Sequence, residues 1–179
     1  AVTGVQTCAL PISAGGGVQI DGGLTVNGGT LGIDTAGTVT ASNGAVVSGA
    51  AAVVTIDGAG SRLDSLTAGP TAQELSNGGQ ITVSNGGLLN MPNAPLTLST
   101  GGVLHIAGGE VIVGSLNSAV TPGSVDFLAG QLHILGNHTF ASGQALGGNF
   151  TLSNNRFLQI DGTATITQYH TLTLDGGHL

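Results

Sequence analysis

Histidine is the first residue type in this sequence whose chemistry needs an explanation. Five of the 179 residues are His, and His105 and His133 share the context Leu-His-Ile, at the centre of an apolar–polar–apolar triplet. Imidazole is the commonest metal ligand in proteins, so two such side chains on neighbouring strands would be able to share an ion. Their separation of 28 residues is longer than the repeat of roughly 20–24 residues expected for this chain. We therefore interpret both as solvated strand residues and predict no metal site.

Aspartate recurs in the turns of the sequence, followed each time by Gly. The four residues are Asp21, Asp57, Asp161 and Asp175. Stacked carboxylates bind Ca²⁺ weakly, because this ion takes several oxygen ligands at flexible distances, but the calcium-binding β-helix repeat is not matched. Asp also shapes turns by hydrogen-bonding to nearby backbone. We expect the turn role, keep weak Ca²⁺ binding as the alternative, and predict no cofactor.

Catalytic groups of the common enzyme classes are scarce. The chain has no Lys, which excludes a phosphate-binding loop that ends in Gly-Lys-Ser or Gly-Lys-Thr, and it contains neither a zinc-protease motif nor a G-x-S-x-G motif. The densest grouping of charged residues is Asp57, Arg62, Asp64 and Glu74, whereas Arg156 has no acidic residue directly beside it. Glycoside hydrolysis needs a pair of carboxylates flanking the scissile bond. We predict no catalytic residues.

The composition limits both the fold and the partners. Gly takes 33 positions, and only 6% of the residues are charged, with 2 Lys and Arg against 9 Asp and Glu and a net charge of −7. So much Gly disfavours long helices, and 40% hydrophobic residues are too many for a disordered acidic tail. Two basic residues cannot neutralise many phosphates, so nucleic-acid binding is not expected. No apolar run is long enough to cross a bilayer as a helix, so we expect no membrane insertion.

The apolar–polar–apolar triplet repeats along the whole chain. Side chains in a strand alternate between two faces, so each triplet predicts a short strand with two residues facing inward and one facing outward. Gly-containing turns such as Asn27-Gly28-Gly29 and Asn85-Gly86-Gly87 separate the triplets. The triplets are residues 18–20, 24–26, 54–56, 81–83, 96–98, 104–106, 125–127, 132–134, 150–152, 158–160, 164–166 and 172–174.

Short repeated strands without a long helix favour a parallel β-helix over an antiparallel meander. Triplets are too short for stable isolated hairpins, whereas in a solenoid each strand pairs with the strands one coil before and after it. Three triplets with their turns make a coil of roughly 20–24 residues, a common β-helix period, and the chain then has room for about seven coils. The sequence therefore predicts an all-β solenoid with an aliphatic core.

Two segments interrupt this rhythm. Residues 61–77 contain fewer triplets and a Pro, and residues 71–76 have the composition of a single helical turn. Residues 89–95 carry two Pro and resemble a loop that leaves the stack. We expect both to be insertions of the kind that a solenoid tolerates on its surface. If the chain has an interaction loop, it lies in one of these segments.

Residues 1–13 differ from the remainder in composition and rhythm. Residues 2–12 resemble the in-frame translation of a sequencing adapter in a metagenomic gene, so we treat residues 1–13 as a non-native, disordered scar and residues 14–179 as a single β-solenoid domain. Cys8, the only cysteine, lies in the scar, so no disulfide or zinc site is expected. Neither end carries a recognisable cap, which predicts an uncapped fragment of a longer protein that tends toward end-to-end self-association.

Two stretches of the chain carry a family resemblance. Residues 54–61, Val-Thr-Ile-Asp-Gly-Ala-Gly-Ser, followed by residues 79–87, Gly-Gln-Ile-Thr-Val-Ser-Asn-Gly-Gly, resemble the repeats of autotransporter passenger domains and of bacterial secreted proteins with PEP-CTERM-type sorting tails. Residues 127–179 are similar to the F-x-G-G-x-L repeats of the same group. The resemblance implies a right-handed parallel β-helix, export to the cell surface or medium, and a structural or adhesive role. The implied partner is an unknown surface ligand, either a polysaccharide or a protein.

The alternative is an enzyme. Residues 55–60 are also similar to a stretch in β-helix polysaccharide lyases and glycoside hydrolases, so a fragment of such an enzyme is the second interpretation. Fold alone does not decide between the two. Aromatic side chains that would stack on sugars are few, namely Phe127, Phe140, Phe150, Phe157 and Tyr169. Because few titratable groups can converge, we expect a stalk segment without catalysis.

Overall fold

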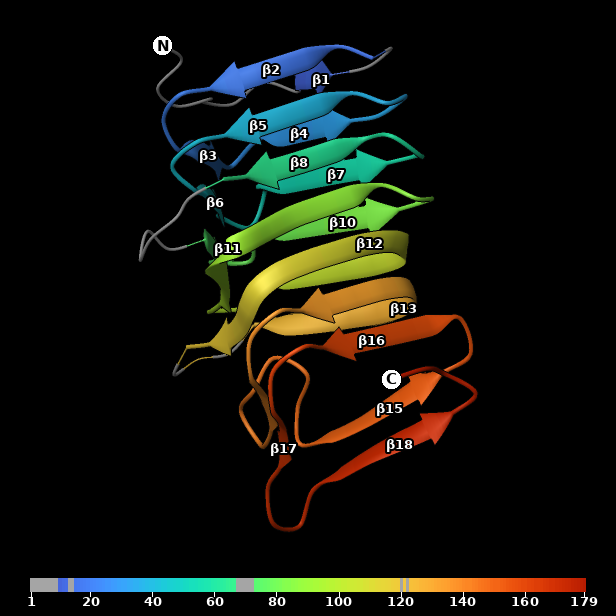
Figure 1. Ribbon diagram of the computed structural model, residues 1–179. Coiled ribbons are helices and arrows are strands. Elements are labelled where there is room, and N and C mark those ends of the chain that lie inside the picture. Colours follow the sequence, from blue (N-terminus) through green and yellow to red (C-terminus); the bar gives the residue numbers. More distant parts are fainter. Residues whose placement is uncertain (1–9, 13–14, 67–72, 120, 122) are drawn as a thin grey trace.

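The structure is a computed structural model that describes residues 10–12, 15–66, 73–119, 121 and 123–179 of the chain. Within these residues all regular structure is β-strand and no helix occurs. Successive strands lie on three faces of one stack, and the chain passes from the first face to the second and third before it returns to the first one coil further along (Figure 1). The winding is right-handed, as connections between parallel strands almost always are. The stack has about 7 turns, which confirms the predicted parallel β-solenoid.

The first face is a parallel ladder in which apolar residues lie opposite apolar residues. Leu31 pairs with Val54, Val54 with Ile81, and Ile81 with Leu104. This register keeps each aliphatic side chain above another one in the interior. The ladder consists of β1 (Leu10–Ile12), β4 (Thr30–Ile33), β7 (Val53–Asp57), β10 (Gln80–Ser84), residues 103–107 of β12 (Val103–Ser118) and residues 124–129 of β13 (Ser124–Ile134).

The second face runs through more coils than the others. Its apolar column contains Val39, Leu63 and Leu89, which are paired in turn, and it continues to Leu158 near the C-terminal end. The ladder consists of β2 (Gly17–Ile20), β5 (Thr38–Ala41), β8 (Arg62–Ser65), residues 88–91 of β11 (Leu88–Leu98), residues 109–113 of β12, residues 130–134 of β13, and β16 (Arg156–Ile160).

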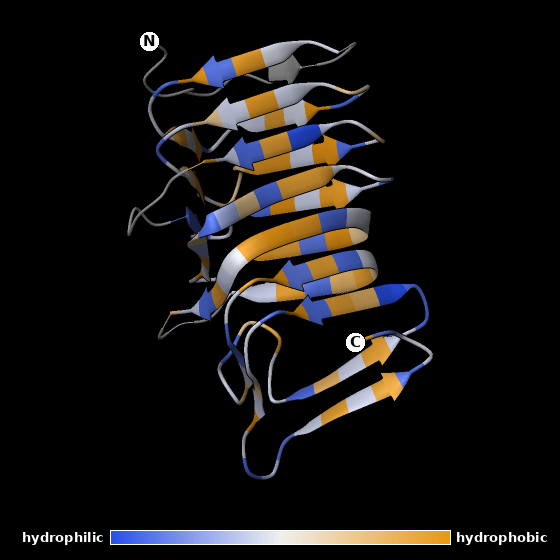
Figure 2. Cartoon of the chain, viewed as in Figure 1, coloured by the Kyte–Doolittle hydropathy of each residue, from blue (hydrophilic) through white to orange (hydrophobic). Residues whose placement is uncertain are grey.

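The third face is the shortest ladder. It consists of β3 (Leu24–Asn27), β6 (Ala45–Ser48), β9 (Gln73–Ser76), residues 95–98 of β11 and residues 115–118 of β12. Strand β12 is continuous around two corners and therefore contributes to all three faces, pairing with β10, β11 and β13. Figure 2 shows the alternation of apolar and polar residues along these strands.

The interior is a column of aliphatic side chains that the triplets supply. In the triplet 54–56, Val54 and Ile56 have no exposed surface while Thr55 lies at the outer side, and Leu104 and Ile106 repeat this pattern around His105. Each fully buried aliphatic side chain of this kind contributes roughly 1.5–3 kcal/mol relative to leaving it in water. The inward and outward positions predicted from the triplets are therefore confirmed in the middle coils.

The corners bring the backbones of successive coils close together. Asn85 and Gly86 both have positive φ, at 50° and 84°, a conformation that Asn and Gly adopt more readily than other residues. The next residue, Gly87, faces the coil before it so closely that an added Cβ would overlap the carbonyl oxygen of Ile56. Gly is required at this corner because its neighbour leaves no room for a side chain.

The two irregular segments of the sequence contribute strands to the stack where the structure describes them. Residues 73–76 form strand β9, not a helical turn, because Gln73 and Leu75 face the core and pair with β6 and β11. Residues 89–95 lie within β11 and do not leave the stack as a loop; the register shifts between Met91 and Pro95 as the strand turns from the second face to the third. A strand corner of this kind tolerates Pro, which cannot donate a ladder hydrogen bond.

Coil length is more variable than expected. Paired residues lie between 20 positions apart, as for Leu96 and Leu116, and 28 positions apart, as for Val46 and Glu74. The longest spacing contains residues 67–72, which lie outside the described residues. At the N-terminal end, residues 10–12 of the segment assigned to a scar form β1, which pairs with β4; residues 1–9 and 13 lie outside the described residues.

Strand pairing is interrupted near the C-terminal end. Among the described strands, β14 (His138–Phe140) pairs only with β17 (Ala164–Ile166), and β15 (Asn149–Ser153) pairs only with β18 (Thr171–Asp175). The ladder that joins these coils to the main stack is the second face, where β16 pairs with β13. Larger side chains occupy the interior here, and the rings of Phe140 and Phe150 stack with centroids 6.1 Å apart.

No helix in the described part of the chain has the length and hydrophobicity to cross a membrane.

Candidate functional site

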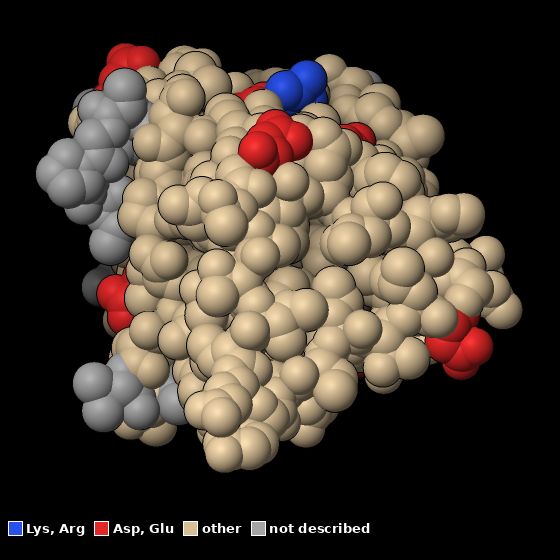
Figure 3. Space-filling view, turned by 60° about the horizontal axis from the view of Figure 1, so that its bottom comes forward, with Lys and Arg blue, Asp and Glu red and all other residues tan. Residues whose placement is uncertain are grey.

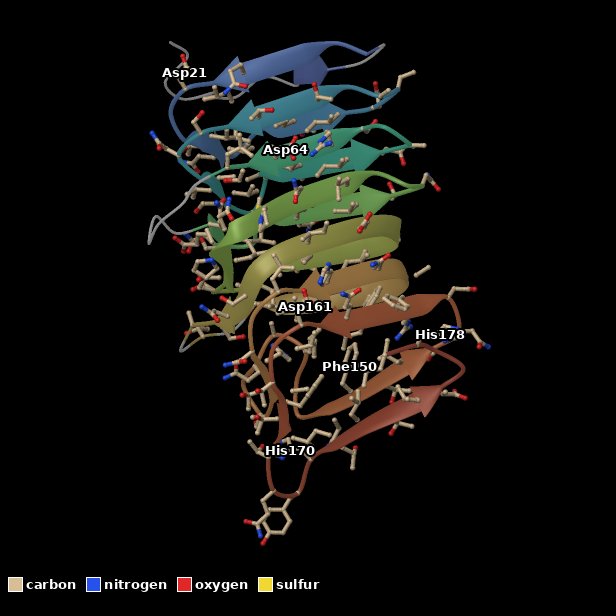
Figure 4. The ribbon with its side chains drawn as sticks, in the orientation of Figure 1. Asp21, Asp64, Phe150, Asp161, His170 and His178 are labelled. Carbon is tan, nitrogen blue, oxygen red and sulfur yellow. The ribbon has the colours of Figure 1, made fainter. Side chains whose placement is uncertain are left out.

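A polar cluster on the second face contains the one ion pair between Arg and a carboxylate in the described residues. Arg62 donates from Nε and Nη2 to the two carboxylate oxygens of Asp64 at 2.7 and 2.5 Å, and Asn90 Nδ2 donates to Asp64 Oδ1 at 2.7 Å. Arg62 and Asp64 are two residues apart on β8 and so face the same side, while Asn90 lies directly opposite Asp64 on β11. Figure 4 labels Asp64 at this point of the stack.

The hydrogen bonds of this cluster occupy both carboxylate oxygens of Asp64, which a catalytic role would need to be free. The Asp64 carboxylate raises the pKa of Arg62 above its ordinary value, because the bidentate hydrogen bond favours the charged guanidinium. Both carboxylate oxygens of Asp64 accept hydrogen bonds. The cluster therefore has the properties of a structural contact that joins neighbouring coils.

The other two residues of the sequence grouping do not join this cluster. Asp57 ends β7 on the first face, where its Oδ1 accepts hydrogen bonds from Ser84 Oγ at 2.6 Å and Asn85 Nδ2 at 2.7 Å. These two bonds lower the pKa of Asp57. Glu74 lies on the third face and accepts a hydrogen bond from Ser99 Oγ at 3.1 Å. The residues Asp57, Asp64 and Glu74 are thus distributed over three faces and do not converge.

The turn aspartates do not form a stack of carboxylates. Asp21 and Asp161 directly follow second-face strands that lie several coils apart, whereas Asp57 ends β7 on the first face and Asp175 ends β18, which pairs only with β15 among the described strands. Asp57 has Ser84 as its neighbour in the next coil. No group of three or more His, Cys, Asp or Glu that would hold a metal ion occurs in the described ranges of the chain.

The two Leu-His-Ile histidines lie on different faces. His105 is on the first face and its Nδ1 lies 3.0 Å from Asp126 Oδ2, while His133 is on the second face and its Nε2 lies 2.9 Å from Asp161 Oδ2. They therefore have separate partners and do not share a site. Two hydrogen bonds lower the pKa of Asp161, and the bond from Gln159 has a larger effect than the bond from His133.

These two His–Asp pairs are a feature that the sequence reasoning missed. His105 and Asp126 each occupy the central position of a triplet, and they are 21 residues apart. Outward residues one coil apart are neighbours on a solenoid, so the spacing was a usable signal for this pair. For His133 and Asp161 the separation is 28 residues, and the signal is hidden by the longer coil.

The core also contains polar side chains that the triplet pattern did not predict. Gln73 is fully buried; its Oε1 accepts a hydrogen bond from the Ala45 backbone N–H at 2.7 Å and its Nε2 donates to Ser65 Oγ at 2.5 Å. His138 is 3% exposed and packs edge-on against Phe140 at 5.0 Å. Its Nε2 has no hydrogen-bond partner among the described residues, and burial lowers the pKa of the imidazole.

The aromatic side chains are mostly unavailable for stacking on a sugar. Phe127 and Phe140 are buried in the core, and Phe150 packs against it. Phe157 is 36% exposed and Tyr169 is 89% exposed, and both lie toward the C-terminal end.

Comparison of the chain with protein families, with curated proteins and with solved structures gave no match.

Proposed function

We propose that this chain is a structural or adhesive stalk segment of a secreted or surface-displayed bacterial protein and that it performs no catalysis. The observation that carries the proposal is the continuous parallel ladder, in which strands of the middle coils are hydrogen-bonded to the coil before and the coil after. Each coil then supports its neighbours along the axis, which makes a solenoid stiff. The resemblance of the repeats to autotransporter passenger domains and PEP-CTERM-type proteins supports export and an extracellular or cell-surface location.

The outer surface suits a neutral, hydrogen-bonding partner. Outward positions of the ladders hold residues such as Thr55, Thr82 and Thr97, and charged residues make up 6% of the chain. A surface of hydroxyl and amide groups fits a polysaccharide or a protein. It does not fit nucleic acid, which needs several Lys and Arg residues to neutralise phosphates.

A polysaccharide lyase or glycoside hydrolase is the alternative function. The observation that favours it is the Arg62–Asp64 pair, which holds a carboxylate in one orientation on the second face, although hydrogen bonds from Arg62 and Asn90 already occupy both carboxylate oxygens. We place it second because the nearest carboxylates of the sequence grouping, Asp57 and Glu74, lie on other faces. Glycoside hydrolysis needs two carboxyl groups on either side of one bond.

The stalk proposal requires that the distance between the two ends is fixed. Spin labels at Cys introduced for Gln19 and Thr173, both exposed and near opposite ends, in a Cys8→Ser background would report this distance by pulsed electron resonance, with unlabelled protein added to suppress signals between molecules. We expect one narrow distance distribution. A broad distribution like that of a flexible linker would contradict a stalk role.

The enzyme alternative is tested by incubating the chain with a panel of acidic and neutral polysaccharides. We expect no new reducing ends and no unsaturated products. Product formation by the wild type that disappears in Asp64→Asn, a substitution that keeps the shape of the side chain, would replace the stalk proposal by the enzyme. Persistence of the products in Asp64→Asn would point to a contaminating activity, which a second purification would remove.

A further inference from the structure

Strand pairing is interrupted inside the stack, with described coils on both sides of the interruption. Residues 115–118 of β12 pair with β11 but with no described strand on their other side, and residues 124–129 of β13 pair with β12 alone. The strands that follow, β14 and β15, pair only with β17 and β18 among the described strands. We call this boundary, with residues 115–118 and 124–129 on one side and β14 and β15 on the other, the seam.

The second face alone continues across the seam as a ladder. Residues 130–134 of β13 pair with β16, from Gly130 opposite Arg156 to Ile134 opposite Ile160. Figure 1 shows β15 and β18 beyond β16, on the C-terminal side of this ladder. Because the described strands lack backbone pairing elsewhere at the seam, the β13–β16 ladder is the axis about which the coils on its two sides can turn.

Two side chains cross the seam in place of the missing ladders. The Arg156 guanidinium donates from Nε to the Leu128 carbonyl oxygen and from Nη1 to the Thr151 carbonyl oxygen, each at 3.3 Å. The imidazole of His138, on β14, hydrogen-bonds to the backbone of Leu116, on β12. Both side chains therefore engage backbone groups at the seam and hold its two sides together.

The interior at the seam contains unsatisfied polar atoms. Ser118 Oγ and His138 Nε2 are the two buried side-chain polar atoms that lack a hydrogen-bond partner in the described residues, and both belong to strands that border the seam. Native proteins satisfy nearly all such atoms, so each exception calls for a reason. Opening of the seam gives both atoms access to water, which lowers the free-energy cost of opening.

The surroundings of His138 make this cost depend on protonation. The ring is 3% exposed and packs edge-on against Phe140. The strands around it, namely residues 115–118, β14, β15 and β17, carry no other ionisable residue. A protonated imidazole in the closed seam therefore has no carboxylate on these strands to offset the loss of water. Opening hydrates the ring, so the open form binds a proton more readily than the closed form.

The ionisable side chains in the corners beside these strands have other partners. Asp161, which precedes β17, is exposed and lies 2.9 Å from His133 Nε2. His170, which follows β17, accepts a hydrogen bond from the Ser142 backbone N–H at 3.0 Å. Figure 3, in which the C-terminal side comes forward, shows mainly uncharged atoms on this side of the molecule. His138 is thus the ionisable group buried at the seam.

We propose that the seam is an acid-operated hinge: protonation of His138 opens it about the β13–β16 ladder, and Arg156 holds it closed at neutral pH. Above the ordinary imidazole pKa of 6.5, His138 is neutral in both forms and the closed form is fully favoured. As the pH falls below that value, the ratio of open to closed molecules rises by up to about tenfold per pH unit, until the closed form is protonated as well.

This inference does not depend on a stalk role, and the closed seam at neutral pH keeps the fixed length that a stalk needs. The test measures how readily a reagent reaches the seam. Ser118→Cys, in a Cys8→Ser background, replaces a buried hydroxyl that has no described partner by a thiol. Its rate of reaction with a pyridyl disulfide is divided by the rate for the same chain in denaturant at the same pH. This normalised rate reports the fraction of molecules in which the seam is open.

We expect the normalised rate of Ser118→Cys to rise by at least about threefold between about pH 7.5 and about pH 5.5. Addition of His138→Leu should abolish this rise, because it removes the group that binds the proton. The matched control is Ala41→Cys in the same background, which places a thiol at a fully buried position of β5, several coils from the seam. Its normalised rate should be the same at both pH values.

Arg156→Met tests the second contact, because it keeps a long side chain but removes the donors to Leu128 and Thr151. It should raise the normalised rate of Ser118→Cys at about pH 7.5 by at least about threefold, as the loss of two hydrogen bonds predicts. Arg62→Met makes the same substitution in the uninterrupted part of the second face and should leave the rate unchanged. An unaltered rate in Arg156→Met would contradict the role of Arg156.

Three results would overturn the hinge. The first is a normalised rate of Ser118→Cys that does not rise in acid. The second is an equal rise when His138→Leu is present, because the proton would then bind elsewhere. The third is an equal rise in Ala41→Cys, because acid would then unfold the whole stack instead of opening the seam.

Discussion

His138 shows how a single residue can make stability depend on pH. The ring is 3% exposed, and one nitrogen, Nε2, has no hydrogen-bond partner in the part of the chain that the structure describes. Burial lowers the pKa of His138 below the ordinary value of 6.5, while a hydrogen bond to the Leu116 backbone opposes this shift. The unfolded chain therefore binds a proton at this residue more readily than the folded chain does. The free energy of unfolding is fully retained above the ordinary pKa and decreases as the pH falls below it toward the folded value.

We predict that His138→Leu reduces the loss of thermal stability between about pH 7.5 and about pH 5, the range in which imidazole titrates. The substitution removes the group whose protonation opposes folding. The measurement is the melting temperature by far-ultraviolet circular dichroism at both pH values.

A matched control for this prediction is His178→Leu, which removes an exposed imidazole by the same substitution. It should keep the pH dependence of the wild type. An unchanged pH dependence in His138→Leu would show that the buried imidazole is not the titrating group.

At the scale of the strand and its corner, the close approach of backbones decides which glycines are essential. Gly87 and Gly22 both lack a positive φ, but a Cβ at Gly87 would overlap the Ile56 carbonyl oxygen, whereas nothing lies within 4 Å of a Cβ at Gly22. The two positions therefore differ in the space around them and not in the backbone conformation they require.

We predict that Gly87→Ala lowers the free energy of unfolding by about 1–3 kcal/mol, the usual effect of overpacking. Gly22→Ala should change it by no more than about 0.5 kcal/mol, as surface substitutions generally do. Chemical denaturation of the two variants and the wild type measures both values. Equal effects of the two substitutions would mean that the corner at Gly87 relaxes to accept a side chain.

At the scale of the whole molecule, stability should be unequal along the axis. Strand β12 is hydrogen-bonded to β10, β11 and β13, whereas β17 and β18 each have one partner strand. In a solenoid, stability is approximately the sum of contributions from neighbouring repeats. The coils beyond β13 are joined to the stack by one ladder, so they should open before the middle coils.

We predict that amides of β17 and β18 exchange with deuterium faster than those of β10 and β12, by at least about tenfold, because local opening costs less free energy there. The measurement is hydrogen–deuterium exchange of the wild-type chain, followed by mass spectrometry of peptides from these strands. Uniform protection along the chain would contradict this prediction.

The triplets determined much of this protein by themselves. An alternation such as Val54-Thr55-Ile56 defines which residues face inward, and Gly-rich turns between triplets define the corners, so the parallel solenoid and its core could be predicted. These features depend on the backbone period of two and on local turn preferences, which are both encoded within a few residues.

Contacts between coils could not be predicted in the same way. Whether His133 meets Asp161, or Asp64 meets Asn90, depends on how many residues each corner holds, and this number varies so that paired residues lie 20 to 28 positions apart. The placement of Gln73 and His138 in the core also depends on neighbours one coil away. Only the tertiary structure decided these contacts, because they arise from the register between coils and not from any local pattern.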